Sequence, residues 1–331
     1  MKIRDFFRLV VLTQLLPVLE SGQEELLVGG QAVVEGVMMR SPHSFCVAVR
    51  QPKGTIAVHT EAIGRLSEKY PYLGYPILRG LGTLGQAMWL GVRALRFSAL
   101  SVLEIEAKAE SGSESGLSKV GNWALTANLI LSVGFFLLFY KFLPLFLATL
   151  IERHFPLFHN HFLFNMTDGL IRLALFLTFL GGVSCWKEIR RVYEYHGAEH
   201  KTVFNFESGE TVSVENARSF SRLHPRCGTS FLLVVMVMSM VLFLVIPFTG
   251  FWMRLLSRIV LLPLVAGLSY EVIRYSARRG GFVWAQLIKP GLWLQRITTQ
   301  PPSDDQLETA VRALDEAMAL ERSQGGELVI A

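Results

Sequence analysis

A polar stretch between two long apolar runs holds the residues best suited to chemistry. It begins with the pattern H-x-x-E-H at His196, Glu199 and His200, and His224 and Cys227 follow. Histidines four residues apart lie on one face of a helix, so their nitrogens can share one divalent cation such as Zn²⁺. On this interpretation His196 and His200 are metal ligands, and Glu199 is the general base that activates a water molecule.

A metal centre of this kind needs at least a third protein ligand. The sequence offers His224, Cys227 and Glu271 for that role. The alternative is a cluster of hydrogen-bonded polar side chains that holds no metal and orders this segment against lipid headgroups. Gly197 lies inside the motif, where it weakens a helix by about 1 kcal/mol relative to alanine. The sequence leaves both interpretations open, with Zn²⁺ or another divalent metal as cofactor in the first and none in the second.

The composition indicates a membrane protein. Hydrophobic residues make up 51% of the chain and charged residues 18%, and the mean hydropathy is +0.39. A soluble domain carries about 25% charged residues. Because the net charge of +5 is explained by basic cytosolic segments, it does not indicate nucleic-acid binding. The three cysteines include no closely spaced pair, which excludes a disulfide framework.

We therefore predict an α-helical polytopic membrane protein with about four transmembrane helices, at about 124–150, 165–186, 230–250 and 252–273. Residues 76–103 are also apolar, but they contain Arg79, Arg93 and Arg96. An arginine at the bilayer centre costs roughly 2.5–3.5 kcal/mol on insertion scales. We expect this segment to be an interfacial or re-entrant helix, although the sequence does not settle whether it crosses.

Small soluble elements complete the predicted organisation. Two β-branched runs, 45–50 and 55–60, flank a Pro-x-Gly turn and predict a β-hairpin, and Gly29 and Gly30 indicate a tight turn before it. The predicted segments are an amphipathic N-terminal helix (1–26), a cytosolic β unit (27–75), the interfacial or re-entrant helix (76–103), a charged loop (104–123), two transmembrane helices (124–186), a cytosolic histidine-rich loop (187–229), a transmembrane hairpin (230–273), and a cytosolic C-terminal segment with an amphipathic helix (274–331).

The distribution of basic residues predicts the orientation. Lysines and arginines concentrate in 187–229 and after the last apolar run, and basic residues mark cytosolic loops. With four spans, both termini and the segment 187–229 are then cytosolic. Lys141 and Arg172 fall inside predicted spans, and charges in such places can mark a transport pathway.

Three strings carry a resemblance to a known family. They are residues 29–40 (GGQAVVEGVMMR), 194–202 (EYHGAEHKT) and 224–230 (HPRCGTS). In this order they resemble the DUF1385 family, also called YqhQ-like, over about residues 27–300. The resemblance implies a multi-pass protein of the bacterial inner membrane that belongs to a family of predicted metal-dependent enzymes with no established activity.

Two functions follow as expectations. The first is a metal-dependent hydrolase with a cytosol-facing site. The second is a non-enzymatic scaffold in the lipid bilayer that docks a partner such as the protein translocation or insertion machinery or a membrane-bound ribosome. Transport through the membrane is a third possibility, based on Lys141 and Arg172 alone.

Overall fold

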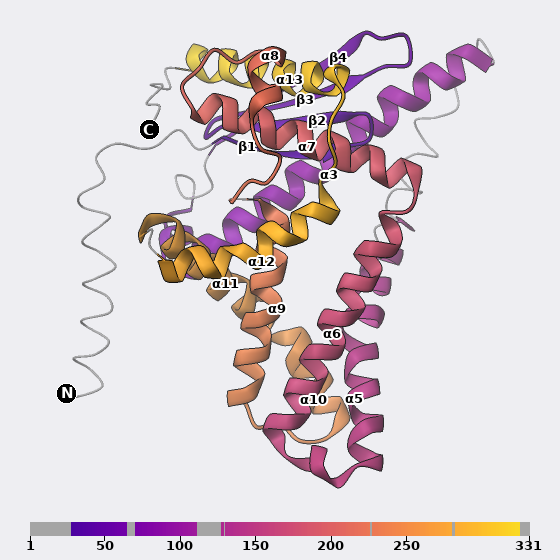
Figure 1. The fold of residues 1–331 in the computed structure, drawn as a ribbon, viewed down its shortest axis with the longest axis vertical. Coiled ribbons are helices and arrows are strands. Elements are labelled where there is room, and N and C mark those ends of the chain that lie inside the picture. Colours follow the sequence, from indigo (N-terminus) through magenta and orange to yellow (C-terminus); the bar gives the residue numbers. More distant parts are fainter. Residues whose placement is uncertain are drawn as a thin grey trace.

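The computed structural model describes residues 28–64, 70–110, 127–128, 130–225, 227–279 and 282–324. The predicted N-terminal helix over 1–26 lies outside these residues. The described part is mostly helical and contains one small β-sheet. In Figure 1 the sheet and its covering helices form one end of the molecule, and the apolar helices extend from it toward the other end.

The sheet has four antiparallel strands in the order β1-β2-β3-β4. The strands are β1 (Gly29–Val33), β2 (Gly36–Arg40), β3 (Ser44–Arg50) and β4 (Ile56–Ala62). The predicted hairpin is confirmed as β3 and β4, which pair from Arg50 opposite Ile56. The tight turn predicted at Gly29 and Gly30 is wrong, because both glycines belong to β1. The chain reverses after this strand, where Glu35 adopts a positive φ of 55°.

Helices cover both faces of the sheet, so neither face of the central strands β2 and β3 is exposed to solvent. α13 (Asp304–Ser323) and α7 (Lys187–Glu207) pack on one face, and α3 (Leu78–Glu110) packs on the other. β2 and β3 are consequently almost entirely buried. The first face is formed by Val37, Met39, Cys46 and Ala48 against Tyr195, Ala198, Leu307, Ala310 and Leu314. The second is formed by Met38, Phe45, Val47 and Val49 against Leu90 and Ala94.

α3 shows how the ambiguous segment 76–103 folds. It is one continuous helix, and part of its surface packs against the sheet. It is not among the described helices that are apolar enough to cross a membrane. Two of its arginines form ion pairs, Arg79 with Glu271 and Arg93 with Glu61. The helix continues to Glu110, so residues 104–110 of the predicted charged loop are helical, and 111–126 lie outside the described residues.

Three described helical segments are long and apolar enough to cross a membrane. They are Ile130–His154, α6 (His161–Val183) and α9 (Gly228–Val245). The first contains a π-helical turn, η2 (Leu138–Phe142), followed by α5 (Leu143–His154). The predicted fourth span is a pair of helices, α10 (Phe251–Val260) and α11 (Leu262–Arg279), bent by 49° at their junction.

The segment 187–229, predicted as the connection between two spans with its histidines on one helix face, is mostly helical. α7 begins after a short turn at the end of α6, and α8 (Val214–Ser219) follows it. The apolar stripe of α7, which includes Tyr195, Ala198 and Val203, packs against the sheet and α13 and so favours the helix. α12 (Phe282–Thr298) was not predicted, whereas the amphipathic tail helix is confirmed as α13.

A buried carboxylate attaches α13 to the sheet. Glu321 is 1% exposed, and it accepts hydrogen bonds from Ser41 Oγ and from the backbone nitrogen of His43, with His43 Nδ1 also in contact. Burial raises the pKa of Glu321, but these partners outweigh it and hold the pKa below its usual value. The ionised carboxylate therefore stabilises the fold above its unfolded-state pKa, and this stabilisation is lost as the pH falls through the folded-state pKa.

Replacing this carboxylate tests the attachment. We expect Glu321→Gln to lower the free energy of unfolding by about 1–3 kcal/mol, because the amide retains the shape and loses the charge-assisted hydrogen bonds. Glu308→Gln is the matched control on the same helix, since Glu308 pairs with Arg50 at the surface. Thermal unfolding of the two variants measures the difference, and equal melting temperatures for both would contradict this role.

Candidate metal centre

The candidate site lies where the sheet meets the apolar helices. α7 supplies His196, Glu199 and His200, and Cys227 is the residue directly before α9. Figure 1 shows α7 lying beside the sheet, with α9 and α12 leading away from this region. The apolar face of α7 is held by the sheet and α13, so its polar residues face the start of α9.

Both histidines of the motif present the same nitrogen to a common space. His196 Nδ1 lies 2.8 Å from the carbonyl oxygen of Thr298, and His200 Nδ1 lies 2.5 Å from that of Arg222. A carbonyl oxygen only accepts, so each Nδ1 must carry the proton and donate. In the neutral rings each Nε2 then has a free lone pair, which is how backbone carbonyls orient metal-binding histidines.

Cys227 completes a group of three ligand atoms. It is the N-cap of α9, and its Sγ lies 3.3 Å from His196 Nε2. Ligand atoms of His196, His200 and Cys227 all lie within 4.8 Å of one another. Cysteine thiolate and imidazole nitrogen are ligands that Zn²⁺ prefers. Of the three candidates for the third ligand, Cys227 is the one that the structure brings into this group.

Glu199 lies beside the histidines in buried surroundings. It is 6% exposed, and its Oε2 is 3.5 Å from His200 Nε2. With the proton of His200 on Nδ1, two lone-pair-bearing atoms face each other. Two facing acceptors repel each other, and a proton or a cation between them relieves this repulsion. A Cβ at Gly30 would lie 2.7 Å from Glu199 Cγ, so the glycine in β1 makes room for this side chain.

His224 lies at the edge of the group. Its side chain is buried, and its Nε2 contacts Glu207 Oε2 at 3.2 Å. Gln295 holds the backbone of His224 in place: it accepts from the His224 nitrogen at 2.8 Å and donates to the His224 oxygen at 2.7 Å. His224 therefore lines the same space as the three ligand atoms and is oriented by a carboxylate.

These residues surround a small cavity of about 100 Å³. This volume holds a metal ion and a few water molecules. Its lining combines polar groups with the glycine-rich start of β1, and the lining residues are Val28, Gly29, Gly30, His196, Glu199, His200, Val203, His224, Cys227 and Gly228.

Glu271 is not among the residues that line this cavity. Its carboxylate binds the guanidinium group of Arg79, and Oε1 also accepts from the backbone nitrogen of Ile77 at 3.1 Å. Glu271 is thus engaged in attaching α11 to the start of α3. The sequence pattern gave no sign of this pairing, because the two charged residues are 192 positions apart.

Three supporting residues were not identified from the sequence. Thr298 and Gln295 lie on α12, which was not predicted, and both are almost fully buried. Gly197 was regarded only as a helix-weakening residue. A Cβ at Gly197 would lie 2.1 Å from the carbonyl oxygen of Gln300, so α7 and the segment after α12 touch at this position. The glycine therefore permits the approach that places Thr298 against His196.

Other charged groups on α7 bind the surrounding backbone and turns. Arg191 binds Glu35 in the β1–β2 turn, and this hydrogen bond raises the pKa of Arg191. Lys201 donates to the carbonyl oxygens of Arg218 and Phe220, while its burial and the nearby Arg222 lower its pKa. These contacts fix both ends of the helical turn that carries the motif.

The fold and the site together define a class of protein. It combines helices of membrane-spanning length with a small sheet module, and a cluster of two histidines and a cysteine lies at their junction. The chain belongs to the DUF1385 family, a family of proteins of unknown function, whose model matches residues 75–320. The match includes most of α13, so the family region extends further toward the C-terminus than the sequence motifs indicated.

A curated relative supports the same assignment. The chain is 35% identical to the uncharacterized protein YqhQ of Bacillus subtilis (strain 168) over 304 residues, which cover 88% of this chain and 92% of the relative. No solved structure matches the chain. The family match and this relative together establish the family of the chain.

The contact at Gly197 gives a sharp test of the site's support. Alanine is the better helix former by about 1 kcal/mol, yet we expect Gly197→Ala to destabilise the protein and weaken metal binding by about 10- to 100-fold. The reason is that the added methyl group displaces the chain at Gln300 and with it Thr298. Competition with a chelator measures the affinity for Zn²⁺.

Gly181→Ala is the control, because Gly181 is also helical and a Cβ there meets nothing within 4 Å. This variant should bind Zn²⁺ as the wild type does. Wild-type affinity in Gly197→Ala would show that the close approach does not orient His196.

Proposed function

We propose that this protein is a membrane-anchored, metal-dependent hydrolase with a cytosol-facing site. The observation that carries the proposal is the convergence of ligand atoms of His196, His200 and Cys227 within 4.8 Å of one another, beside the buried carboxylate of Glu199. Three protein ligands leave a fourth tetrahedral position open, which distinguishes catalytic from structural zinc sites.

The donor set fits Zn²⁺ better than the hard cations. Ca²⁺ and Mg²⁺ prefer oxygen ligands, whereas imidazole and thiolate select Zn²⁺ and neighbouring transition metals. A divalent metal held by these side chains would supply a Lewis acid that lowers the pKa of a water molecule to about 7. A cation there also relieves the facing lone pairs of His200 Nε2 and Glu199 Oε2, which are 3.5 Å apart.

Glu199 is the general base in this proposal. Its carboxylate lines the cavity and can accept the proton of a water molecule that attacks a carbonyl or phosphoryl group. His224 also lines the cavity, and its contact with Glu207 holds the ring in place. We assign His224 to the binding of the developing negative charge or the leaving group.

The membrane location is proposed from composition. The helices of spanning length and the basic segments on the side of α7 support a multi-pass protein of the bacterial inner membrane. With three spans and a fourth that is bent, the sheet, α7 and α13 lie on the cytosolic side, as do both termini. The site would then act at the inner surface of the membrane.

A scaffold function has a specific observation in its favour. The first turns of α7 expose Lys187 and Arg190 beside Trp186, which is 66% exposed. Basic and aromatic side chains at a helix start suit contact with anionic lipid headgroups or with a partner at the membrane surface. The translocation or insertion machinery and membrane-bound ribosomes are partners of this kind. Recovery of such a complex from native membranes, with no metal in the purified protein, would favour this alternative.

Metal content is the first test of the hydrolase. We expect about one Zn²⁺ per chain in protein purified without chelators, lost in His196→Ala, His200→Ala and Cys227→Ser. His159→Ala, which changes an exposed histidine between α5 and α6, is the control and should keep the metal. Elemental analysis of the four variants and the wild type measures this directly. Wild-type protein without metal would contradict the proposal.

The base is tested separately from the ligands. We expect Glu199→Gln to retain the metal and to lower hydrolysis of p-nitrophenyl esters and bis(p-nitrophenyl) phosphate by about 10²- to 10⁴-fold, since proton transfer is lost. Both probes are activated substrates that a metal-dependent hydrolase can cleave without its natural binding contacts. A loaded Glu199→Gln variant as active as the wild type would remove Glu199 from the mechanism.

A further inference from the structure

A second polar cluster lies inside the apolar helices, away from the candidate metal centre. Asp168 and Arg172 on α6 and Arg258 on α10 are each no more than 3% exposed. Lys141, on η2, is 5% exposed, and η2 packs against both α6 and α10. The sequence indicates Lys141 and Arg172 as charges inside predicted spans but gives no sign of the other two, although Asp168 is one helical turn from Arg172.

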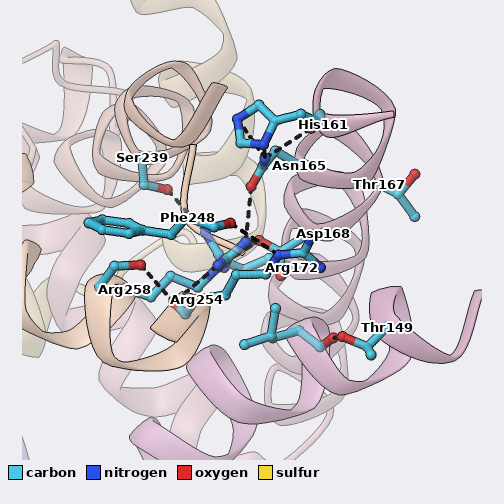
Figure 2. A network of polar contacts seen from close by, with 12 residues as sticks. Thr149, His161, Asn165, Thr167, Asp168, Arg172, Ser239, Phe248, Arg254 and Arg258 are labelled. Carbon is cyan, nitrogen blue, oxygen red and sulfur yellow. Dashed lines mark hydrogen bonds and ion pairs between the residues drawn. The ribbon is translucent and has the colours of Figure 1, made fainter. Parts of the chain in front are cut away.

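The contacts of Asp168 use only half of its carboxylate. Oδ2 accepts from Arg172 at 2.6 Å and from Arg258 Nε and a terminal nitrogen at 3.1 and 3.0 Å. Figure 2 shows the two guanidinium groups meeting at this carboxylate. Oδ1 is buried and, among the described residues, has no hydrogen-bond partner. The carboxylate thus binds α6 to α10 and keeps one acceptor unused.

The arginines are held by further neutral groups. Arg172 donates to Ser239 Oγ on α9 at 3.1 Å, and Arg258 donates to Asn165 Oδ1 at 3.1 Å. Nε of Arg172 is also buried and lacks a partner within the described part of the chain. A donor without a partner in a dry interior is unfavourable, because no hydrogen bond offsets its desolvation.

The charges of this cluster do not balance. Two arginines, Arg172 and Arg258, share the single carboxylate of Asp168, and the neighbouring Arg254 is already paired with Glu152. Serine and asparagine contribute no charge. Uncompensated positive charge is strongly disfavoured in the apolar part of a membrane, so such groups mark ion or substrate sites.

The helix geometry around the cluster supports the same conclusion. Lys141 lies in a π-helical turn, a feature that is rare and found mainly at functional sites. Arg258 lies at the end of α10, directly before the 49° bend that separates it from α11. Broken helices in membrane proteins commonly form binding sites for charged ligands.

We propose that this cluster binds a phosphate group, with Lys141 and the free edge of Arg172 as its ligands. Arginine and lysine together are the usual partners of phosphate, and Arg172 offers Nε without losing its bonds to Asp168 and Ser239. The bound anion compensates the excess charge, and the unused Oδ1 of Asp168 accepts from a hydroxyl or ammonium group of the ligand. The phosphate belongs either to a phospholipid headgroup or to a free anion, and the proposal is independent of the metal centre.

The test uses the full-length protein, purified in detergent and stripped of lipid. Thermal unfolding is followed by tryptophan fluorescence with short-chain phosphatidylglycerol against the matching diacylglycerol, and with inorganic phosphate against chloride at equal ionic strength. We expect a phosphate-bearing ligand to raise the melting temperature of the wild type. We expect Lys141→Met to bind the phosphate-bearing ligand about ten-fold more weakly than the wild type, or more weakly than that, because one charged ligand is lost.

Two further variants keep the result interpretable. Lys53→Met removes an exposed lysine in the turn between β3 and β4 and should respond as the wild type does. Arg172→Lys keeps the charge but loses Nε as a donor, and it should bind the phosphate-bearing ligand more weakly. Stabilisation by phosphatidylglycerol alone assigns the site to a lipid headgroup, and stabilisation by inorganic phosphate assigns it to a free anion. No stabilisation of the wild type by either ligand, or an equal response of Lys141→Met and Lys53→Met, would overturn the proposal.

Discussion

Two hydrogen bonds to backbone carbonyls determine what the polar cluster on α7 can do. They run from His196 Nδ1 to Thr298 and from His200 Nδ1 to Arg222. Because each Nδ1 must donate, each Nε2 is left with a lone pair in the neutral ring. His196 Nε2 lies 3.3 Å from Cys227 Sγ, and His200 Nε2 lies 3.5 Å from Glu199 Oε2. Without these bonds the rings could rotate or change tautomer, and the same residues would form an ordinary hydrogen-bonded cluster.

The rest of the fold supplies those carbonyls. Gly197 lets the segment after α12 touch α7, and a backbone hydrogen bond from Gln300 to Tyr193 fixes the contact. Gln295 ties α12 to the backbone at His224, just before the N-cap of α9. The sheet and α13 hold the opposite face of α7 through Tyr195 and its neighbours. The site is therefore assembled from segments that only the complete fold brings together.

The sequence predicted the local parts of this arrangement and not the long-range ones. The apolar runs gave the helices of spanning length, and the four-residue spacing of His196 and His200 gave their common face. The choice among His224, Cys227 and Glu271 depended on contacts between distant segments, such as the pairing of Glu271 with Arg79. The spacing of the motif indicated a helix at His196 and His200, whereas the packing of the apolar stripe of α7 on the sheet depends on the fold.

Zinc K-edge X-ray absorption on the purified protein identifies the atoms bound to the metal. With His196, His200 and Cys227 as ligands, we expect one sulfur at about 2.3 Å from the metal and nitrogen or oxygen neighbours at about 2.0–2.1 Å. Cys227→Ser should remove the sulfur contribution and leave the nitrogen shell in place, because His196 and His200 keep their backbone partners. A spectrum without sulfur in the wild type, or with several sulfurs, would contradict the assignment of His196, His200 and Cys227 as the metal ligands.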